Sequence, residues 1–483
     1  MRILFMNHIS NGPAFNSAVA ALSGFLKRHN PSIETFMLNV RAEDLENLIL
    51  DGVKDSVKNN NTVNNISPKI ENILSEIIKI SPDIIAFSIH TPHWQGISSI
   101  ISAIKTTGSS INAMIVCGGY HPTLCPEEVI NHNGVDIICI GEGERPFLDL
   151  VQRLENRKNY TDIDGLWVKK RSLFGTKIIK NNLPEPENLD ELPYWDREIF
   201  AESGISSEQF SLTHIGGFPM ASGRGCPYNC NFCNNSSILK MYSANGHKGK
   251  HYVRKRSVEN VIAECQFLVE KYNAQSFEFW DEMFATDSEW VKTFCEIYKE
   301  KINKPFICAI RVERADKITL HRLRDAGCKC LFMGVEVGNE SYRKKYLNRN
   351  MSNEVIAKAF EDAKAVGLER FAWVMIGLPD ETPQLIEETI SFLFEIKPDI
   401  IGWSLFHPLP GTYLYNYCIE KGYMQIEKDK LNSNLEESFV FPYQNAPTYK
   451  VPLLKQPSIS KEEVITFCDR FRELEQNGFR VNR

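Results

Sequence analysis

Residues Gly223–Cys233 read Gly-Arg-Gly-Cys-Pro-Tyr-Asn-Cys-Asn-Phe-Cys, and this stretch decides how the chain is interpreted. Its cysteines, Cys226, Cys230 and Cys233, follow a C-x3-C-x2-C spacing, which allows one short loop to hold three irons of a 4Fe-4S cluster. The fourth iron would lack a protein ligand, and an open coordination position is typical of catalytic metal sites. The flanking glycines let the backbone approach the cluster closely. A zinc loop is the alternative, but no fourth ligand follows at zinc-like spacing.

Strand-like and helix-like segments alternate around this loop from about residue 206 to 425. Helix caps such as Ser257 and Asp287, and helix stops such as Gly327 and Pro398, separate the segments. Strands are predicted at 276–280, 306–310, 330–335, 371–376 and 400–406. Counting a first strand before the cysteines, these six strand–helix units predict a partial (β/α)6 barrel. The tail at 426–483 is predicted to be irregular and then helical from Ser460, which starts a capping box. This tail is expected to cover the open side of the barrel.

The first 155 residues show a second α/β pattern. Short apolar strands are predicted at 2–7, 34–38, 83–89, 113–117 and 136–140, with helices at 16–29, 69–80, 95–105, 127–131 and 146–155. Such alternation predicts a doubly wound, flavodoxin-like parallel sheet, in which ligands bind at the carboxyl ends of the strands. Residues 156–205 are predicted to be a connector with a small β element at 165–168.

Composition limits the class of protein. The 483 residues suit two or three domains, and 43% apolar residues are enough for full cores. A net charge of −6 gives no case for nucleic-acid binding, and the basic run at 248–256 is interpreted as a solvated loop rather than an anion site. No apolar run is long enough to span a bilayer, and 13 cysteines without a secretion signal indicate reduced thiols and a cytoplasmic protein.

The cysteine loop, with Phe232 just before its last cysteine, resembles the radical S-adenosylmethionine (SAM) enzymes. The resemblance extends over about 215–420 and implies that the open iron chelates the amino and carboxylate groups of SAM. It implies an adenine contact for Phe232, and five polar or turn residues at successive strand ends complete the expected site. Asp281 or Glu282 would bind the amino group, Arg311 would face the carboxylate, Glu336 would lie near the ribose hydroxyls, and Gly377 would form the adenine-side turn.

Three strand ends of the first domain carry glycines and hydroxyls. Ser88–Pro92, Gly118–Thr123 and Gly141–Glu144 follow the third, fourth and fifth predicted strands. Glycines let a large flat ligand approach the backbone, and hydroxyls can bond to its amide arms. Ordinary tight turns would look the same, so these residues alone leave the ligand open.

Together with the cysteine loop, this layout resembles the cobalamin-binding radical SAM family over about 1–425. The resemblance implies corrin contacts at Gly12, Pro13, Ser88, Thr91, Gly118, Gly119, His121, Pro122, Thr123, Glu142, Gly143 and Glu144. The Asp-x-His-x-x-Gly loop that ligates cobalt in one cobalamin pattern is absent, because Asn7–Gly12 has the wrong spacing. The lower cobalt face would then be empty, water-bound or met by another side chain such as His8.

The resemblance implies methylation of an unactivated carbon through a 5′-deoxyadenosyl radical and methylcobalamin. Radical oxidation, cyclisation or ring rearrangement on the same scaffold is the alternative, with or without cobalamin. A non-catalytic iron–sulfur protein is a more distant alternative, since electron-transfer clusters usually have four cysteine ligands. The expected partners are a small-molecule substrate and a low-potential electron donor such as a flavodoxin or ferredoxin. Aromatic residues including Trp280, Trp373 and Trp403 are consistent with an apolar or planar substrate, although such residues more often belong to the core.

Overall fold

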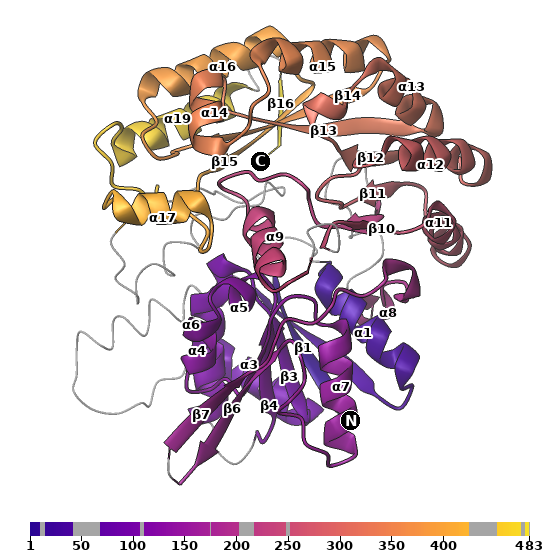
Figure 1. The fold of residues 1–483 in the computed structure, drawn as a ribbon, viewed down its shortest axis with the longest axis vertical. Helices are drawn as coiled ribbons and strands as arrows, with labels where there is room; N and C mark the ends of the chain where they lie inside the picture. The colour runs from indigo at the N-terminus through magenta and orange to yellow at the C-terminus, as the bar shows by residue number, and fades with distance from the viewer. Residues whose placement is uncertain are drawn as a thin grey trace. The chain divides into compact units, whose positions relative to one another are not determined.

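The computed structural model describes residues 1–9, 15–41, 68–106, 111–173, 175–201, 217–247, 252–424, 452–474 and 479–482. The chain divides into two compact units (Figure 1). The first unit runs from Met1 to Ser206, and the second takes the rest of the chain except for a short stretch outside the described residues. Each unit contains its own seven-stranded sheet.

The sheet of the first unit begins with five parallel strands. They are β1 (Arg2–Ile9), β2 (Glu34–Arg41), β3 (Ile84–Ser88), β4 (Met114–Gly118) and β5 (Ile137–Cys139). Their order, β2-β1-β3-β4-β5, is that of flavodoxin-like doubly wound sheets, so the predicted fold class is confirmed. Strand β3 is almost entirely buried, as expected for a strand covered by helices on both faces.

Two further strands extend this sheet beyond the prediction. β6 (Leu166–Ser172) pairs antiparallel with β5, and β7 (Gly175–Lys180) pairs antiparallel with β6. The sequence placed this β element in the connector. It joins the sheet because Leu166 and Val168 are fully buried, whereas Lys170 and the residues after it are exposed.

Helices cover both faces of the first sheet (Figure 1). α1 (Ser17–His29) packs against α7 (Glu144–Glu155), and α3 (Pro68–Ile80) packs against α4 (Trp94–Thr106). The short elements are η1 (Thr91–His93), α5 (Tyr120–Leu124), α6 (Pro126–Asn131), η3 (Leu189–Glu191) and α8 (Glu198–Ala201). Of these, only α6 was predicted, at 127–131; η1 and α5 follow strand ends directly, where the sequence indicated only turns.

The second unit is built on parallel strands in chain order. They are β8 (Phe218–Met220), β11 (Phe277–Phe279), β12 (Phe306–Ala309), β13 (Cys328–Glu336), β14 (Glu369–Ile376), β15 (Ile400–Leu405) and β16 (Arg480–Asn482). The sheet runs β8-β11-β12-β13-β14-β15-β16, with β8 and β16 at its edges. Six of these strands are the ones predicted for a partial (β/α)6 barrel; β16 from the tail is an addition.

Helices connect and follow the strands of this second sheet (Figure 1). They are α9 (Asn234–Ala244), α11 (Val258–Tyr272), α12 (Ser288–Lys301), α13 (Lys317–Ala326), α14 (Glu340–Leu347), α15 (Asn353–Ala365), α16 (Pro383–Ile396), α17 (Tyr413–Glu420) and α19 (Lys461–Glu473), with the short η5 (Val312–Arg314). The predicted caps are confirmed: Asp287 accepts hydrogen bonds from two backbone N–H groups of α12, and Gly327 ends α13 with φ of 108°. Ser460 and Glu463 form the predicted capping box.

The two faces of the second sheet bury different clusters. Leu331, Met333 and Val335 of β13 point into the large core beneath the helices. The alternate residues form a smaller cluster in which Phe332 and Trp373 pack on Phe371, with ring centroids 4.6 and 4.9 Å apart. Helix α19 adds Phe467 and Phe471 to the large core, so the tail is part of the second unit.

Candidate functional site

The cysteine loop follows β8 and leads into α9. It begins in a two-stranded antiparallel ribbon of β9 (Gly223–Arg224) and β10 (Arg254–Lys255). Gly225 adopts φ of +84°, and a Cβ there would lie 2.7 Å from the carbonyl oxygen of Tyr252. Glycine is therefore required immediately before Cys226 by both conformation and space.

Two helices of the barrel anchor the middle of the loop. Asn231 donates its side-chain amide to the carbonyl oxygen of Tyr346 (2.8 Å), and Asn348 donates its own to the carbonyl oxygen of Asn229 (2.8 Å). The backbone N–H of Leu414 donates to the carbonyl oxygen of Asn231 (3.1 Å). The C-terminal end of α14 and the N-terminal end of α17 thus fix the loop without using its thiols.

The three cysteine thiols are free, and they lie close enough to interact electrostatically. Burial, with a smaller effect of the nearby Cys230 and Cys226, raises the pKa of Cys233 to about 12. Burial also raises the pKa of Cys226, while the Arg311 guanidinium opposes that shift. Bound metal would reverse this balance, because a coordinated thiol loses its proton. Three neighbouring thiols on an anchored loop next to a cation fit a cluster that takes three thiolate ligands.

Arg311 lies at the cysteine loop. Its Nη1 is 3.6 Å from Sγ of Cys230, and its guanidinium carbon lies 3.8 Å from the centroid of the Tyr228 ring. Glu313 accepts from Nε (3.1 Å) and Nη2 (2.6 Å), which fixes the plane of the guanidinium. The sequence resemblance placed this residue against the SAM carboxylate; in the structure its partners are a cluster cysteine, a loop tyrosine and Glu313.

Asp281 and Glu282 have different surroundings, although they are adjacent in sequence. Asp281 is buried and accepts from the backbone N–H of Ser222 (2.9 Å), the Ser222 hydroxyl (2.6 Å) and Nζ of Lys255 (2.8 Å). Glu282 accepts a 3.2 Å bond from the N–H of Gly225, and its side chain is exposed to solvent. Desolvation by the protein around it nevertheless raises the pKa of Glu282.

Glu336 ends β13 in a left-handed conformation, with φ of +67°. Its Oε1 is 3.1 Å from Nη1 of Arg349, which also donates to the carbonyl oxygen of Gly334 (2.7 Å). Burial raises the pKa of Glu336, and Arg349, Arg311 and Arg343 oppose the shift. The carboxylate predicted near the ribose therefore forms a buried ion pair at the strand end.

Gly377 opens a tightly bonded turn after β14. Glu381 Oε2 accepts from the backbone N–H of Gly377 (2.6 Å) and of Leu378 (3.1 Å). Asp380 accepts from the hydroxyl groups of three tyrosines on or next to α14 and α17. Because α14 also holds the cysteine loop, this one helix links the predicted adenine-side turn to the cluster loop.

Several residues of this site were missed by sequence reasoning. They are Ser222, Tyr228, Lys255, Glu313 and Arg349. The Arg-x-Glu spacing of Arg311 and Glu313 was a usable signal, since residues two apart outside a helix can pair. Arg349 carried none, because it comes from the loop after α14 and reaches Glu336 only through the fold.

In the first unit, the ends of β3 and β4 are joined. The N–H of Ile89 donates to the carbonyl oxygen of Gly118 (2.8 Å), and the N–H of His121 donates to that of Ile89 (3.0 Å). Gly119 adopts φ of +101°, and a Cβ there would lie 2.8 Å from the Ile89 nitrogen. Gly118 differs, because its nearest contact would be 3.6 Å away, at Cβ of Cys139. Ser88 pairs with Gly118 across the strand ends.

The predicted corrin contacts that the structure describes gather at this edge, on β3, β4 and the turns after them. Thr123 accepts from the N–H of Gly141 (3.1 Å), which ties the turns after β4 and β5 together. Gly143 and Glu144 begin α7, Glu142 precedes them, and Pro122 and His121 are buried in α5. Burial lowers the pKa of His121 to about 3. Gly12 and Pro13 lie outside the described residues.

Two buried polar atoms at this edge fit a ligand with amide arms. Neither Thr91 Oγ1 nor Gln95 Oε1 has a hydrogen-bond partner among the described residues. An unpartnered buried polar atom costs free energy, so its presence at a strand end favours a bound group that would satisfy it. Together with the glycines at the end of β4, these atoms fit the hydroxyl and backbone contacts expected for a corrin.

Comparison with known proteins identifies two domains. Residues 220–393 match the radical SAM superfamily, and residues 17–151 match the B12 binding domain. The chain thus combines a radical SAM domain with a B12-binding domain. Its radical SAM domain implies a 4Fe-4S cluster and SAM, and its B12-binding domain implies cobalamin.

Individual relatives share this arrangement. This radical SAM protein is 26% identical over 347 residues, 71% of each chain, to an uncharacterized methyltransferase of Pyrococcus horikoshii. It is 23% identical to the anaerobic magnesium-protoporphyrin IX monomethyl ester cyclase of Cereibacter sphaeroides, covering 82% of this chain but only 60% of the cyclase. The solved structure of the methyltransferase TsrM from Kitasatospora setae, with cobalamin and a 4Fe-4S cluster, matches with a TM-score of 0.62 at 14% identity over 87% of this chain and 78% of TsrM.

Within the described part of the chain, no helix is both long and apolar enough to cross a lipid bilayer.

Proposed function

We propose that this protein is a cobalamin-dependent radical SAM enzyme that transfers a methyl group to an unactivated carbon of a small molecule. The observation that carries the proposal is the combination, in one chain, of an anchored three-cysteine loop and a sheet whose strand ends fit a corrin. When bound, the cluster, SAM and cobalamin supply the electron transfer, the carbon radical and the methyl group. The protein has to hold and orient them and keep out water.

The chain's own residues divide this work. Cys226, Cys230 and Cys233 hold the cluster, with Arg311 beside Cys230 as the nearby positive charge. Glu282 is the better candidate for the SAM amino group, because Asp281 already accepts three hydrogen bonds. We assign Phe232, half-buried on the cysteine loop, to the adenine, as the resemblance implies.

Residues at two further strand ends are then the candidates for contacts with the adenosine part of SAM. Glu336, held by Arg349, offers a carboxylate at the end of β13 for the ribose hydroxyls. Gly377 offers backbone in a turn that Glu381 and the tyrosines around Asp380 keep rigid. A rigid site lowers the cost of ordering a flexible ligand such as SAM.

The inner side of the barrel is suited to an apolar or planar substrate. Phe332 and Trp373 are half-buried there, and Gly402 leaves room for the rings, since a Cβ at Gly402 would lie 2.4 Å from Phe371. Trp403, in contrast, packs on Phe471 of α19 and belongs to the core. The substrate class thus rests on Phe332 and Trp373 rather than on the whole set of aromatic residues.

Radical oxidation or cyclisation is the second candidate function. It is supported by the similarity to the cyclase, which covers 82% of this chain. Both functions use the same cluster and SAM site. They differ in whether the corrin receives a methyl group from SAM.

The test uses full-length protein that is purified and reconstituted with iron, sulfide and hydroxocobalamin in the absence of oxygen. SAM labelled with deuterium on its methyl group is added with a low-potential reductant, either dithionite or a reduced flavodoxin. The bound corrin is then extracted, and both the corrin and 5′-deoxyadenosine are measured by mass spectrometry. The variant Cys230→Ala, which lacks a cluster ligand, is the matched control for cleavage of SAM.

Methyl transfer predicts a deuterated methyl group on the extracted corrin, together with 5′-deoxyadenosine that Cys230→Ala does not form. Deoxyadenosine with an unlabelled corrin would favour oxidation or cyclisation instead. Absence of both products in protein with intact iron and bound corrin would contradict the radical enzyme as proposed.

We further propose that the substrate is met in the cytoplasm and that a flavodoxin or ferredoxin supplies the electron. The domain limits near residues 155, 205 and 425 belong to the same proposal. Limited proteolysis of the folded protein, with the fragments identified by mass, tests these limits directly, because cleavage concentrates in exposed linkers between compact domains.

A further inference from the structure

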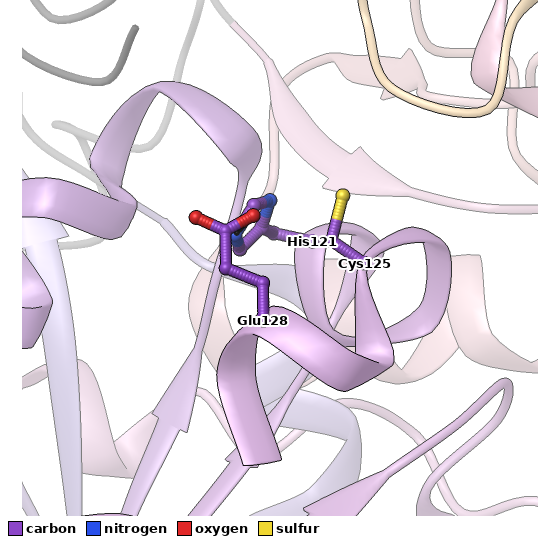
Figure 2. A group of neighbouring side chains, drawn as sticks. All are labelled: His121, Cys125 and Glu128. Carbon is purple, nitrogen blue, oxygen red and sulfur yellow. Dashed lines mark ion pairs between the residues drawn. The ribbon is translucent and has the colours of Figure 1, made fainter. Parts of the chain in front are cut away.

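Two short helices after β4 bring three metal-binding side chains together. His121 lies in α5, Cys125 in the junction between the helices, and Glu128 in α6 (Figure 2). One ligand atom from each, an imidazole nitrogen, a thiol sulfur and a carboxylate oxygen, lies within 4.8 Å of the other two. They come from the first unit, whereas the cysteine loop lies in the second.

His121 is the buried member of the group. Its side chain is 1% exposed, and neither ring nitrogen has a hydrogen-bond partner among the described residues. The nearest charged atom is Oε2 of Glu128, 3.8 Å from Nε2, too far for a hydrogen bond. A buried imidazole with both nitrogens unsatisfied is costly, so the site favours a group that would accept a lone pair from the ring.

The backbone fixes this group in place. Cys125 ends α5 by donating its N–H to the carbonyl oxygen of His121 (2.7 Å), and Pro126 starts α6 directly afterwards. The Trp94 ring packs on the other side of His121, with centroids 5.4 Å apart. The three ligands therefore have little conformational freedom to lose when an ion binds, which increases affinity.

We propose that His121, Cys125 and Glu128 form a second metal site, which binds a divalent ion of the zinc class. One imidazole, one thiolate and one carboxylate form a mixed N, S, O donor set of the kind that zinc takes in tetrahedral sites. The fourth position is left to water or to a group from a bound molecule. The imidazole and the thiolate do not match calcium or magnesium, which prefer oxygen ligands.

The site is accessible to solvent at Cys125 and Glu128. Cys125 is half-buried and the Glu128 side chain is 44% exposed, so an ion can enter from solvent on the side of these two residues. His121 closes the inner side. Binding releases the Cys125 proton, because the thiolate is the ligand.

The same histidine was expected to contact a corrin, and the two roles make different predictions. A corrin contact needs His121 alone, whereas a metal site also needs Cys125 and Glu128. Substitutions at these two positions therefore test the metal site without changing the buried histidine.

The experiment uses the full chain with its 4Fe-4S cluster intact, stripped of loosely bound metal with EDTA and then equilibrated with zinc chloride. Zinc and iron are counted on the same sample by plasma mass spectrometry. We expect about one zinc per chain with unchanged iron. The variants Cys125→Ser and Glu128→Gln should bind zinc at least about 100-fold more weakly, since each loses a direct ligand.

Matched controls are available close by. Glu127→Gln changes the neighbouring carboxylate, which pairs with Lys180 instead, and Cys139→Ala removes another buried thiol of the same unit. Both should keep the zinc. X-ray absorption at the zinc edge should find one sulfur at about 2.3 Å and otherwise nitrogen or oxygen at about 2.0–2.2 Å.

Three results would each overturn the proposal. The first is a chain that retains no zinc, or retains it equally in Cys125→Ser. The second is a zinc with three sulfur ligands, which would place the ion at the cysteine loop. The third is displacement of all zinc by stoichiometric hydroxocobalamin, which would assign His121 to the corrin.

Discussion

The two parallel sheets of this protein carry opposite chemistry at their strand ends. In the second unit these ends hold ionisable side chains: Asp281, Arg311, Glu336 and Glu381 are buried, and Glu282 is exposed. In the first unit the ends of β3 and β4 hold small neutral residues: Ser88, Thr91, Gly118 and Gly119. The folds share strand direction and helix cover, so the difference lies in the residues alone.

This contrast follows from the ligands. SAM carries an ammonium, a carboxylate and a sulfonium in a small molecule, and fixed charges in a dry site recognise such groups strongly. A corrin is large and flat with amide arms, and it needs close backbone and hydroxyl partners rather than charge. The comparison predicts that charge-removing changes disable the second unit, while added bulk disables the first.

The largest expected effect is loss of a cysteine on the loop. Cys230→Ala removes one of three thiolates, so we expect incomplete iron loading and a fall of at least about 1,000-fold in deoxyadenosine formation. Iron content and product are measured on the same sample. Cys295→Ala, a buried thiol beneath the helices, should keep full iron; equal loss in both would mean that general unfolding is the cause.

Asp281→Asn and Glu282→Gln separate the two adjacent carboxylates. Asp281→Asn leaves Lys255, whose side chain is 14% exposed, without its counter-ion, so we expect a loss of about 3 kcal/mol of stability. Glu282→Gln should leave stability nearly unchanged and weaken SAM binding about tenfold. Denaturant unfolding and equilibrium dialysis with SAM give the two readings. If Asp281→Asn instead weakened SAM binding and Glu282→Gln lowered stability, Asp281 would be the residue that binds the SAM amino group.

Gly119→Ala and Gly118→Ala separate a loss of stability from a loss of corrin binding in the first unit. Alanine at Gly119 is strained at φ of +101° and meets the Ile89 backbone, so we expect a loss of about 2 kcal/mol. Alanine at Gly118 meets no atom closer than 3.6 Å, so the fold should persist while corrin binding weakens. Calorimetry and corrin absorbance measure the two effects. Unchanged corrin binding in Gly118→Ala would remove this glycine from the corrin surface.

The sequence predicted both fold classes because strands and caps are local features. Asp287, Gly327 and Ser460 act within a few residues of where they stand, so their roles could be identified without a structure. The β6–β7 hairpin was predicted only in part, because its place in the first sheet depends on pairing with β5, far away in the chain.

Site residues could be predicted where the residue type and its position after a strand were enough to indicate a role. This was so for the cysteine loop and for the glycine turns. The ion-pair partners of the site carboxylates could not be predicted in this way. Arg349 contacts Glu336, and Lys255 contacts Asp281, only because the fold brings distant segments together. For the same reason the sequence could not choose between Asp281 and Glu282, whereas their hydrogen bonds differ clearly.

The smallest expected effect is a pH dependence at the turn after β14. Burial raises the pKa of Glu381 to about 8, above its ordinary 4.5, although two backbone N–H bonds oppose the shift. Between these values the unfolded chain loses the proton that the folded chain keeps, so rising pH favours unfolding. We expect a stability loss of roughly 1 kcal/mol between about pH 6 and 7.

Glu381→Gln keeps an oxygen for both N–H groups but cannot titrate. The decrease of its unfolding free energy with pH, measured by denaturant unfolding, should therefore vanish. The exposed Glu361→Gln should keep the slope. A wild-type slope of the opposite sign would mean that the two N–H bonds outweigh burial and that the carboxylate is charged in the fold.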